Sequence, residues 1–174
     1  NRRRTDRRIR ELAGRFGAPL EIARDPTEIR TALARLRERG AGAIALSGGD
    51  GTIQAAVTAL RSDPESAAEP PLLAILPSGT TAMTAADMGL SGTSPRALSR
   101  LLRWAEGQGP HPAIRERSLL RVRAYPGAEP AFGFFLGGAG VANGVRHFHR
   151  VRQRFPGVRP ALMLVRGLLE LPFG

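Results

Sequence analysis

The chain has 174 residues, a length typical of one ordinary domain or two small ones, and 42% of them are hydrophobic, which is enough for a buried core. It contains no cysteine, so disulfide frameworks and thiolate zinc sites are excluded. The net charge is +11, and all 26 cationic residues are arginine. The absence of lysine excludes a Walker A loop, a protein-kinase phosphate clamp and a Schiff-base lysine. The charge favours anionic partners, although a GC-rich genome would produce the same surplus of arginine.

The first part of the chain, residues 1–106, alternates between helical and strand patterns. Apolar residues at helical spacing predict an amphipathic helix over 4–16, and a short apolar run predicts a strand over 20–23. The next helix is predicted to begin after Asp25, a favoured N-cap residue that is followed by a proline and then by a glutamate at the third helical position. This helix should end at Gly40, a natural C-terminal stop.

Two further strands are predicted, and each precedes a turn of small residues and then a helix. The strands are expected over 43–46, buried on both faces, and over 72–76; their turns over 48–52 and 77–81; a polar, proline-rich loop over 62–71; and a last helix from Ser94. Strands and helices that alternate in this way form a parallel sheet covered by helices. The fold class predicted for this part is therefore α/β.

The pattern changes after a linker rich in glycine and proline at 107–110. Two strands joined by a Pro-Gly turn are predicted over 118–125 and 131–137, a basic helix over 144–154 and an apolar helix over 160–171. We therefore divide the chain into an α/β domain, residues 1–106, and part of a β-rich second domain, residues 107–174. Because the first helix has no strand before it and the β-rich region is short, we expect the sequence to belong to a longer protein.

The segment LSGGDGTIQ, residues 46–54, places three glycines and one aspartate between a strand and a helix. Backbone N–H groups at a helix N-terminus attract anions, and Gly48 and Gly49 would let the backbone approach phosphate oxygens closely. Thr52 can offer its hydroxyl. Asp50 would repel an anion unless it holds Mg²⁺, so the combination indicates metal-assisted phosphoryl transfer. The alternative is that Asp50 caps the helix and the glycines only form a tight turn.

The second turn, residues 77–81, occupies the same topological position, after a strand and before a helix. In open parallel sheets, ligands bind outside the carboxyl ends of the strands. The two turns are therefore expected to face one cleft, which favours the phosphate-binding interpretation over the tight turn.

The two turns together resemble a known family. Gly48-Gly49-Asp50-Gly51-Thr52 matches the GGDGT signature of the diacylglycerol kinase catalytic-domain family, which includes sphingosine kinases and bacterial lipid kinases. NAD kinases and phosphofructokinases carry similar turns, but Pro77-Ser78-Gly79-Thr80, with the helix that ends in Met88-Gly89-Leu90, is similar to the lipid-kinase pattern P-x-G-T-x-N-x-x-A…L-G. A third stretch, residues 135–141, resembles the F-x-N-x-x-G-x-G segment that opens the family's β-rich second domain.

The resemblance implies a nucleotide-binding domain of the NAD kinase and diacylglycerol kinase type, followed by the start of a β-rich domain. Its cofactors would be ATP and Mg²⁺, and its acceptor a lipid hydroxyl. By this resemblance the cofactor-binding residues are Gly48, Gly49, Asp50, Gly51, Thr52, Ser78, Gly79 and Thr80, and Asp50 is also the metal ligand and the catalytic residue. The family's catalytic acidic residue lies in its C-terminal portion, and residues 1–174 offer no counterpart to it.

The sequence lacks the family's asparagine at three positions, and only one of them keeps an amide, as Gln54. Gln54-Ala55 stand where the family has Asn-Glu, Ala82 stands in place of the asparagine after G-T-x, and Gly137 in place of the asparagine of F-x-N. An amide supplies both donors and an acceptor, so its loss weakens the positioning of a ligand. Beside a lipid kinase, a catalytically degenerate nucleotide- or membrane-binding module stays open, and so does an NAD-kinase-like enzyme.

The expected partners are a lipid substrate and an anionic membrane contacted peripherally; a homodimer is kept open. Nucleic acid is not expected, because the arginines are spread along the chain. Arginines over 146–154 precede the apolar segment 161–171, as in an interfacial enzyme, although a solvated helix followed by a core helix is the alternative. His147 and His149 are interpreted as surface residues rather than metal ligands. With no apolar run of about 18 residues and no signal peptide pattern, a cytoplasmic protein at the inner face of the membrane is expected.

Overall fold

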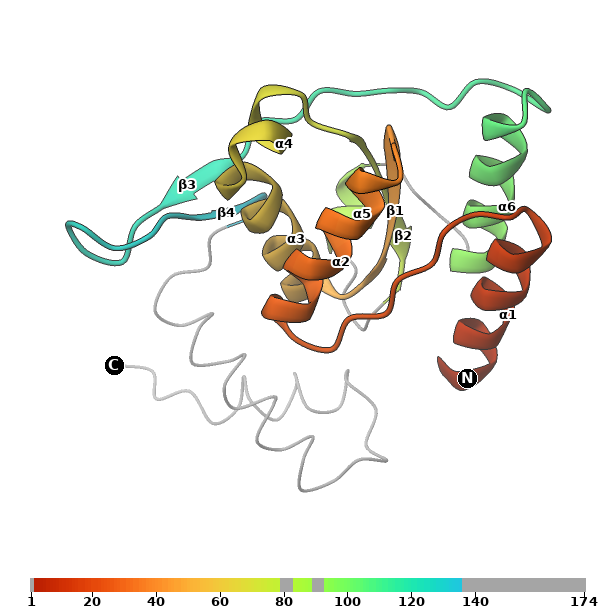
Figure 1. Cartoon of the computed structure of the whole chain (residues 1–174), viewed down its shortest axis with the longest axis horizontal. Coiled ribbons are helices and arrows are strands. Elements are labelled where there is room, and N and C mark those ends of the chain that lie inside the picture. Colours follow the sequence, from red (N-terminus) through yellow and green to blue (C-terminus); the bar gives the residue numbers. More distant parts are fainter. Residues whose placement is uncertain (1, 79–82, 89–92, 136–174) are drawn as a thin grey trace, which may run out of the picture. The chain divides into compact units, whose positions relative to one another are not determined.

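A computed structural model describes residues 2–78, 83–88 and 93–135 of the chain (Figure 1). The helices and strands of these residues lie in one compact unit, Asn1–Phe134. In chain order they are α1 (Arg2–Arg15), α2 (Pro26–Glu38), β1 (Ala43–Gly48), α3 (Asp50–Ser62), α4 (Pro64–Ala68), β2 (Leu72–Pro77), α5 (Met83–Asp87), α6 (Ser94–Ala105), β3 (Leu120–Val122) and β4 (Ala131–Gly133). The helices predicted over 144–154 and 160–171 lie outside the described residues, as does Gly137.

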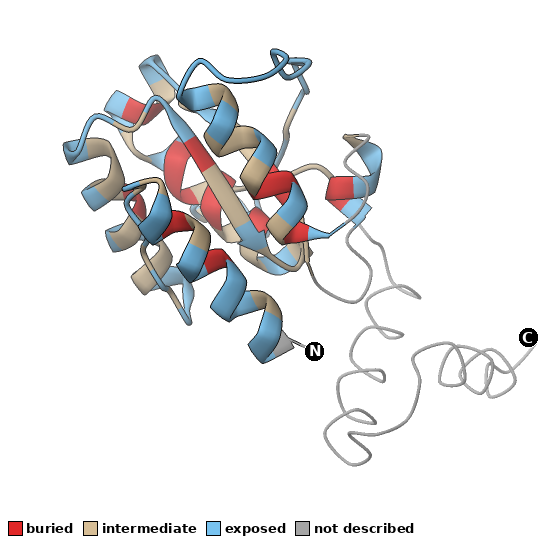
Figure 2. Cartoon of the chain, turned by 90° about the vertical axis from the view of Figure 1, so that its right-hand side faces the viewer, coloured by how far each residue is buried: buried red, intermediate tan, exposed pale blue. Residues whose placement is uncertain are grey.

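Strands β1 and β2 form a parallel pair, in register from Ala43 opposite Leu72 to Gly48 opposite Pro77. Helices cover both faces of this pair. On one face Leu33 of α2 and Leu60 of α3 pack with Ile44 of β1. Figure 2 shows the buried residues concentrated where the helices meet the strands. The α/β prediction is confirmed for this unit.

The opposite face of the strand pair is covered by α1 and α6. Ile9 of α1 and Ala97 and Leu98 of α6 pack with Leu76 of β2. Because successive side chains of a strand point to opposite faces, Ala45 faces α1 and α6 while its neighbour Ile44 faces α2 and α3. The short strands are therefore held between two layers of helices.

The start of α2 follows the capping signals in the sequence. The Asp25 carboxylate accepts a hydrogen bond from the Glu28 backbone N–H at 2.9 Å, and the Glu28 carboxylate accepts one from the Arg24 N–H at 2.6 Å. Gly40 follows the helix with a φ of 75°, which glycine adopts at little cost. The predicted limits of this helix are confirmed.

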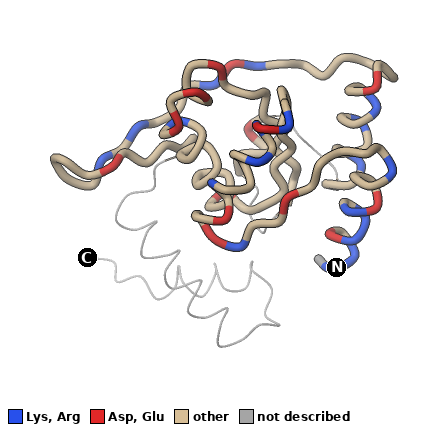
Figure 3. Tube along the Cα trace, in the orientation of Figure 1, with Lys and Arg blue, Asp and Glu red and all other residues tan. Residues whose placement is uncertain are grey.

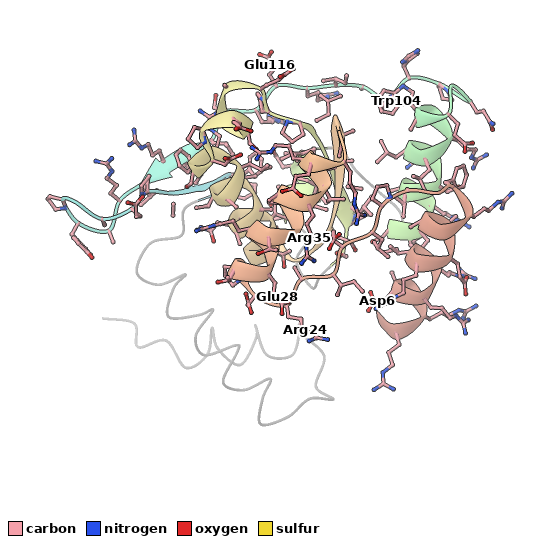
Figure 4. The ribbon with its side chains drawn as sticks, viewed as in Figure 1. Asp6, Arg24, Glu28, Arg35, Trp104 and Glu116 are labelled. Carbon is pink, nitrogen blue, oxygen red and sulfur yellow. The ribbon has the colours of Figure 1, made fainter. Side chains whose placement is uncertain are left out.

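The strand predicted over 20–23 is wrong, because these residues form no regular structure. Leu20 and Ile22 are 42% and 55% exposed, so the apolar positions that suggested a strand are not buried in a sheet. The Glu21 carboxylate lies 3.5 Å from Arg35 on α2 and 3.7 Å from Arg39, the C-cap residue of that helix. Arg35 is labelled in Figure 4. This segment is therefore held by ion pairs and not by pairing with a strand.

Two other details of the α/β region differ from the prediction. The first strand is not buried on both faces throughout, since Ala43 is exposed. The segment over 62–71 is not only a loop, because it contains the short helix α4. Asp63 caps α4 by accepting a hydrogen bond from the Ser66 N–H at 3.1 Å, and a proline follows it at the first helical position. The same Asp-Pro signal that located the start of α2 was present here.

The strands β3 and β4 form the predicted antiparallel hairpin, with shorter strands than expected. Its Pro-Gly turn closes with a hydrogen bond of 3.1 Å from the Ala128 N–H to the Tyr125 carbonyl, and Gly127 has a φ of 86°, as a type II turn requires. The hairpin packs on α3. The β-rich second domain and the division after residue 106 stay predictions. No helix in the described part of the chain is long and apolar enough to cross a membrane.

Candidate functional site

The two turns of small residues begin at the same edge of the parallel pair. Gly48, the last residue of β1, lies opposite Pro77, the last residue of β2. The Ser78 hydroxyl donates a hydrogen bond to the Gly48 carbonyl at 2.9 Å, so the second turn is fastened to the first. Both turns therefore begin at the carboxyl ends of neighbouring strands, as predicted. Gly79 and Thr80 lie outside the described residues.

Asp50 joins the first turn to the start of α5 through its carboxylate. Its Oδ1 accepts hydrogen bonds from the Thr84 N–H at 3.1 Å and from the Thr84 hydroxyl at 2.9 Å, and its Oδ2 accepts a longer one from the Met83 N–H at 3.4 Å. Met83 and Thr84 are the first two residues of α5, so Asp50 caps that helix. The alternative drawn from the sequence had Asp50 capping the helix that follows it directly. The N-cap of that helix, α3, is Gly49.

This capping role depends on Thr84, which the sequence did not indicate. Thr84 is only 3% exposed, and its hydroxyl is satisfied by Asp50. The two residues are separated by 34 positions in sequence, so no local spacing pattern points to the pair. The contact exists only because β1 and β2 bring the two helix starts together.

A magnesium ion would find one carboxylate at this edge. Within the described part of the chain, no group of three or more His, Asp or Glu side chains is placed to hold a metal ion. Mg²⁺ is usually bound through one or two carboxylates together with phosphate oxygens and water, so a single aspartate fits an ion held mainly by a nucleotide. The metal-binding and catalytic roles of Asp50 stay predictions.

The three glycines of the first turn differ in what the fold requires. A Cβ at Gly48 would lie 2.5 Å from the Thr52 Cβ, so this position has no room for a side chain. A Cβ at Gly49 or at Gly51 would meet nothing within 4 Å. Gly49 has a φ of −81°, which any residue adopts. Packing therefore explains Gly48, whereas Gly49 and Gly51 leave an open approach to the backbone at the start of α3.

The helix that carries this turn is firmly placed. Its buried stripe, which includes Ile53, Val57 and Leu60, packs against the strands. Its first turn closes through the Gly49 carbonyl, which accepts hydrogen bonds from the N–H groups of Thr52 at 2.9 Å and Ile53 at 3.1 Å. A helix N-terminus fixed in this way presents its positive dipole end at the edge of the sheet.

The fold and the edge geometry define an α/β protein whose glycine turns lie where parallel sheets bind their ligands. The family model of the diacylglycerol kinase catalytic domain matches residues 2–108, which is more than half of the chain. The chain belongs to this family, as its two turns predicted. No curated protein and no solved structure gave a match. The family match ends before residues 135–141, so the third resemblance stays a prediction.

Proposed function

We propose that this protein is a lipid kinase that transfers the γ-phosphate of ATP, with Mg²⁺, to a hydroxyl of a diacylglycerol-like or sphingoid lipid. Membership of the diacylglycerol kinase catalytic-domain family supports a kinase-type function. The observation that carries the proposal further is the pair Gly49 and Gly51. Neither glycine is required by packing, yet both stand at the edge where a phosphate would approach the backbone.

When bound, ATP supplies the transferable phosphoryl group and Mg²⁺ the positive charge that neutralises its oxygens. The backbone from Gly49 to Gly51 would face the phosphates, helped by the dipole of α3. Ser78 holds the second turn against Gly48. Asp50 holds the start of α5 in place against the first turn. In this proposal these residues position the ligand. The reaction takes place in the cytoplasm, at the inner face of the membrane.

The proposal is tested by phosphoryl transfer from ATP and Mg²⁺ with the full-length protein. The acceptors are diacylglycerol, a sphingosine-like base, phosphatidylglycerol and NAD. The informative variant is Gly51→Ala. A methyl group there would obstruct the phosphate, and transfer should fall by about ten- to a hundredfold, since misplacement by about 1 Å can cost that much. The free energy of unfolding should stay the same or rise by about 0.5–1 kcal/mol, because alanine favours the helix.

The matched control is Gly14→Ala in α1, where an added Cβ also meets nothing within 4 Å. It should stabilise the fold to a similar degree and leave transfer unchanged. Asp50→Ala is a poorer probe, because it also removes the cap of α5. Phosphoryl transfer at the wild-type rate by Gly51→Ala would show that the phosphates do not bind at this turn. Transfer to NAD alone would make the protein an NAD-kinase-like enzyme, and a failure to bind ATP would make it a degenerate module of the same fold.

A further inference from the structure

Helices α1 and α6 lie side by side (Figure 1). Their side chains form the walls of an open groove. Ile9 and Leu12 of α1 pack against Leu98 and Leu102 of α6, which fixes the spacing of the two helices. Five arginines line the groove: Arg8 and Arg15 from α1, and Arg96, Arg100 and Arg103 from α6. In Figure 4 the labelled Asp6 and Trp104 mark these two helices. The groove lies on the face of the β1–β2 pair opposite α2 and α3.

The charge of this arginine groove is not neutralised by neighbouring carboxylates. Glu11 is the acidic residue that lines it, and its carboxylate already pairs with Arg7 at 3.4 Å. Within the described part of the chain, none of the five groove arginines forms a salt bridge. Arg103 donates only to the backbone and hydroxyl oxygens of Ser99, at 3.4 Å each. Figure 3 shows the run of cationic residues along α1.

Some arginines elsewhere in the unit are paired with carboxylates. On α2, Arg35 pairs with Glu21, and Arg37 pairs with Asp63 and Glu65. Arg39, the C-cap residue of α2, also pairs with Glu21. Helices α1 and α6 together carry ten arginines and two carboxylates, whereas α2 carries three arginines and two carboxylates, so the positive charge is denser on α1 and α6. Such a local surplus is better explained by an anionic ligand than by arginine usage in the genome.

The start of α6 adds to the positive potential. Thr93, its N-cap, makes no capping bond with its side chain, and its first turn contains no acidic residue. Thr93 and Pro95 both line the groove, so the positive end of the helix dipole faces the same space as the arginines. Guanidinium groups bind phosphate oxygens through paired hydrogen bonds, which suits them to phosphate-bearing headgroups.

We propose that the arginine groove docks the protein on an anionic phospholipid leaflet, with phosphate headgroups bound between α1 and α6. The choice of a lipid surface rests on the proposed function, since a lipid acceptor and its phosphorylated product lie in such a leaflet. The lining of the groove contains no aromatic side chain, whereas surfaces for single-stranded nucleic acid combine basic residues with aromatic ones. Clusters of four to eight basic residues on a helix surface are typical of sites for anionic lipids.

The test is co-sedimentation of the full-length protein with vesicles of neutral phosphatidylcholine, alone or mixed with phosphatidic acid. The triple variant Arg8→Gln, Arg96→Gln, Arg100→Gln removes three groove charges. Each basic residue near an anionic surface contributes roughly fivefold to partitioning, so the triple variant should bind the mixed vesicles about a hundredfold more weakly. Neutral vesicles should bind neither protein, and thermal unfolding should show that the variant is folded.

The matched control is Arg30→Gln, Arg121→Gln, Arg123→Gln, which removes the same charge from exposed positions on α2 and the β3–β4 hairpin. It should retain nearly full binding to the mixed vesicles. Equal losses in both triple variants would show that only net charge matters and would overturn the groove. So would a triple groove variant that keeps vesicle binding but loses affinity for an oligonucleotide, because the groove would then be a nucleic-acid site.

A kinase assay with the acceptor dispersed in detergent separates this proposal from the proposed function. If the groove variant transfers phosphate in detergent but not on vesicles, both proposals are supported. If the protein binds anionic vesicles through the groove and phosphorylates no acceptor, the docking surface stands and the kinase proposal falls. Transfer on vesicles that is unchanged in the groove variant would overturn the docking surface alone.

Discussion

Asp50 lies where two helices begin, and its carboxylate serves the second of them. Three donors from Met83 and Thr84 converge on it, which fixes the start of α5 against the start of α3. The cap of α5 is thus enough to explain a carboxylate at this position. If activity were lost on removal of the carboxylate, the cause could be either the lost cap or a lost catalytic group.

The glycines beside Asp50 carry cleaner information about function. Gly48 is fixed by Thr52, which an added Cβ would approach to 2.5 Å. At Gly51 the fold accepts a side chain. A substitution that the fold accepts but that obstructs the ligand is the best probe of a binding site. Such a substitution leaves stability unchanged or raises it while it lowers activity.

Asp63 explains part of the loss of folding stability at low pH. The hydroxyl and the N–H of Ser66 donate to its carboxylate, and together with Arg37 they hold the pKa of Asp63 below its ordinary value of 3.8. A carboxyl with a lowered folded-state pKa stabilises the protein above its unfolded pKa, and this contribution is lost as the pH falls through the folded-state pKa. The loss therefore lies below about pH 3.8.

We expect Asp63→Asn to flatten this dependence, because asparagine still caps α4 but cannot titrate. Urea unfolding of both proteins at neutral pH and near pH 3 measures it. The wild type should lose more stability than Asp63→Asn on acidification. An equal loss in the two proteins would contradict the assignment.

The location of the candidate site was predictable from sequence at residue level, but its internal contacts were not. An apolar run, the GGDGT turn and a helical stripe that begins at Ile53 place the first turn after a strand and before a helix. The bond between Asp50 and Thr84 joins residues 34 positions apart, so it depends on the pairing of β1 with β2. Local sequence patterns cannot predict a contact between residues so far apart in the chain.

Among the elements, those marked by both a cap and a periodic apolar face were predicted well. Helix α2 has the Asp25 cap and a buried stripe, and both agree with the structure. The strand over 20–23 was inferred from an apolar run alone. In the structure this segment forms no strand, and its Glu21 pairs with Arg35 and Arg39. Helix α4 was missed because its five residues are too few to show a period, although its cap was visible.

One side chain of α3, that of Thr58, hydrogen-bonds to the backbone of the β3–β4 hairpin. The Thr58 hydroxyl donates to the Phe132 carbonyl at 3.0 Å and accepts from the Phe132 N–H at 2.9 Å. It thus satisfies both backbone groups of a residue in β4, as a neighbouring strand would. A two-stranded hairpin is marginal alone, so this contact and the packing on α3 hold it in the unit.

Thr58→Val keeps the shape and removes the hydroxyl, which leaves two partly buried backbone groups without this partner. We expect a loss of about 1–3 kcal/mol in the free energy of unfolding and faster hydrogen exchange at the Phe132 N–H. Thr31→Val on α2 is the control, because its hydroxyl makes an exposed bond to the Thr27 carbonyl. It should change stability by less than about 0.5 kcal/mol. Unchanged exchange at Phe132 would show that packing alone fixes the hairpin.

At the scale of the whole molecule, two electrostatic effects oppose each other. A net charge of +11 destabilises the folded chain through self-repulsion, most strongly where the charges of α1 and α6 lie together. The ion pairs of α2 with Glu21 and Asp63 act in the opposite direction. Their partners are partly exposed, so each pair contributes at most about 1 kcal/mol.

Repulsion should therefore dominate, and screening it should stabilise the protein. We expect Tm to rise as salt is added from low ionic strength and to level off once the Debye length approaches about 10 Å, near 0.1 M. The triple groove variant should start from a higher Tm and rise less, since it lacks three of the repelling charges. The triple variant on α2 and the hairpin has the same net charge and should stay closer to the wild type. A Tm that falls with salt would mean that the ion pairs outweigh the repulsion, and the arginine groove would then not be a centre of unbalanced charge.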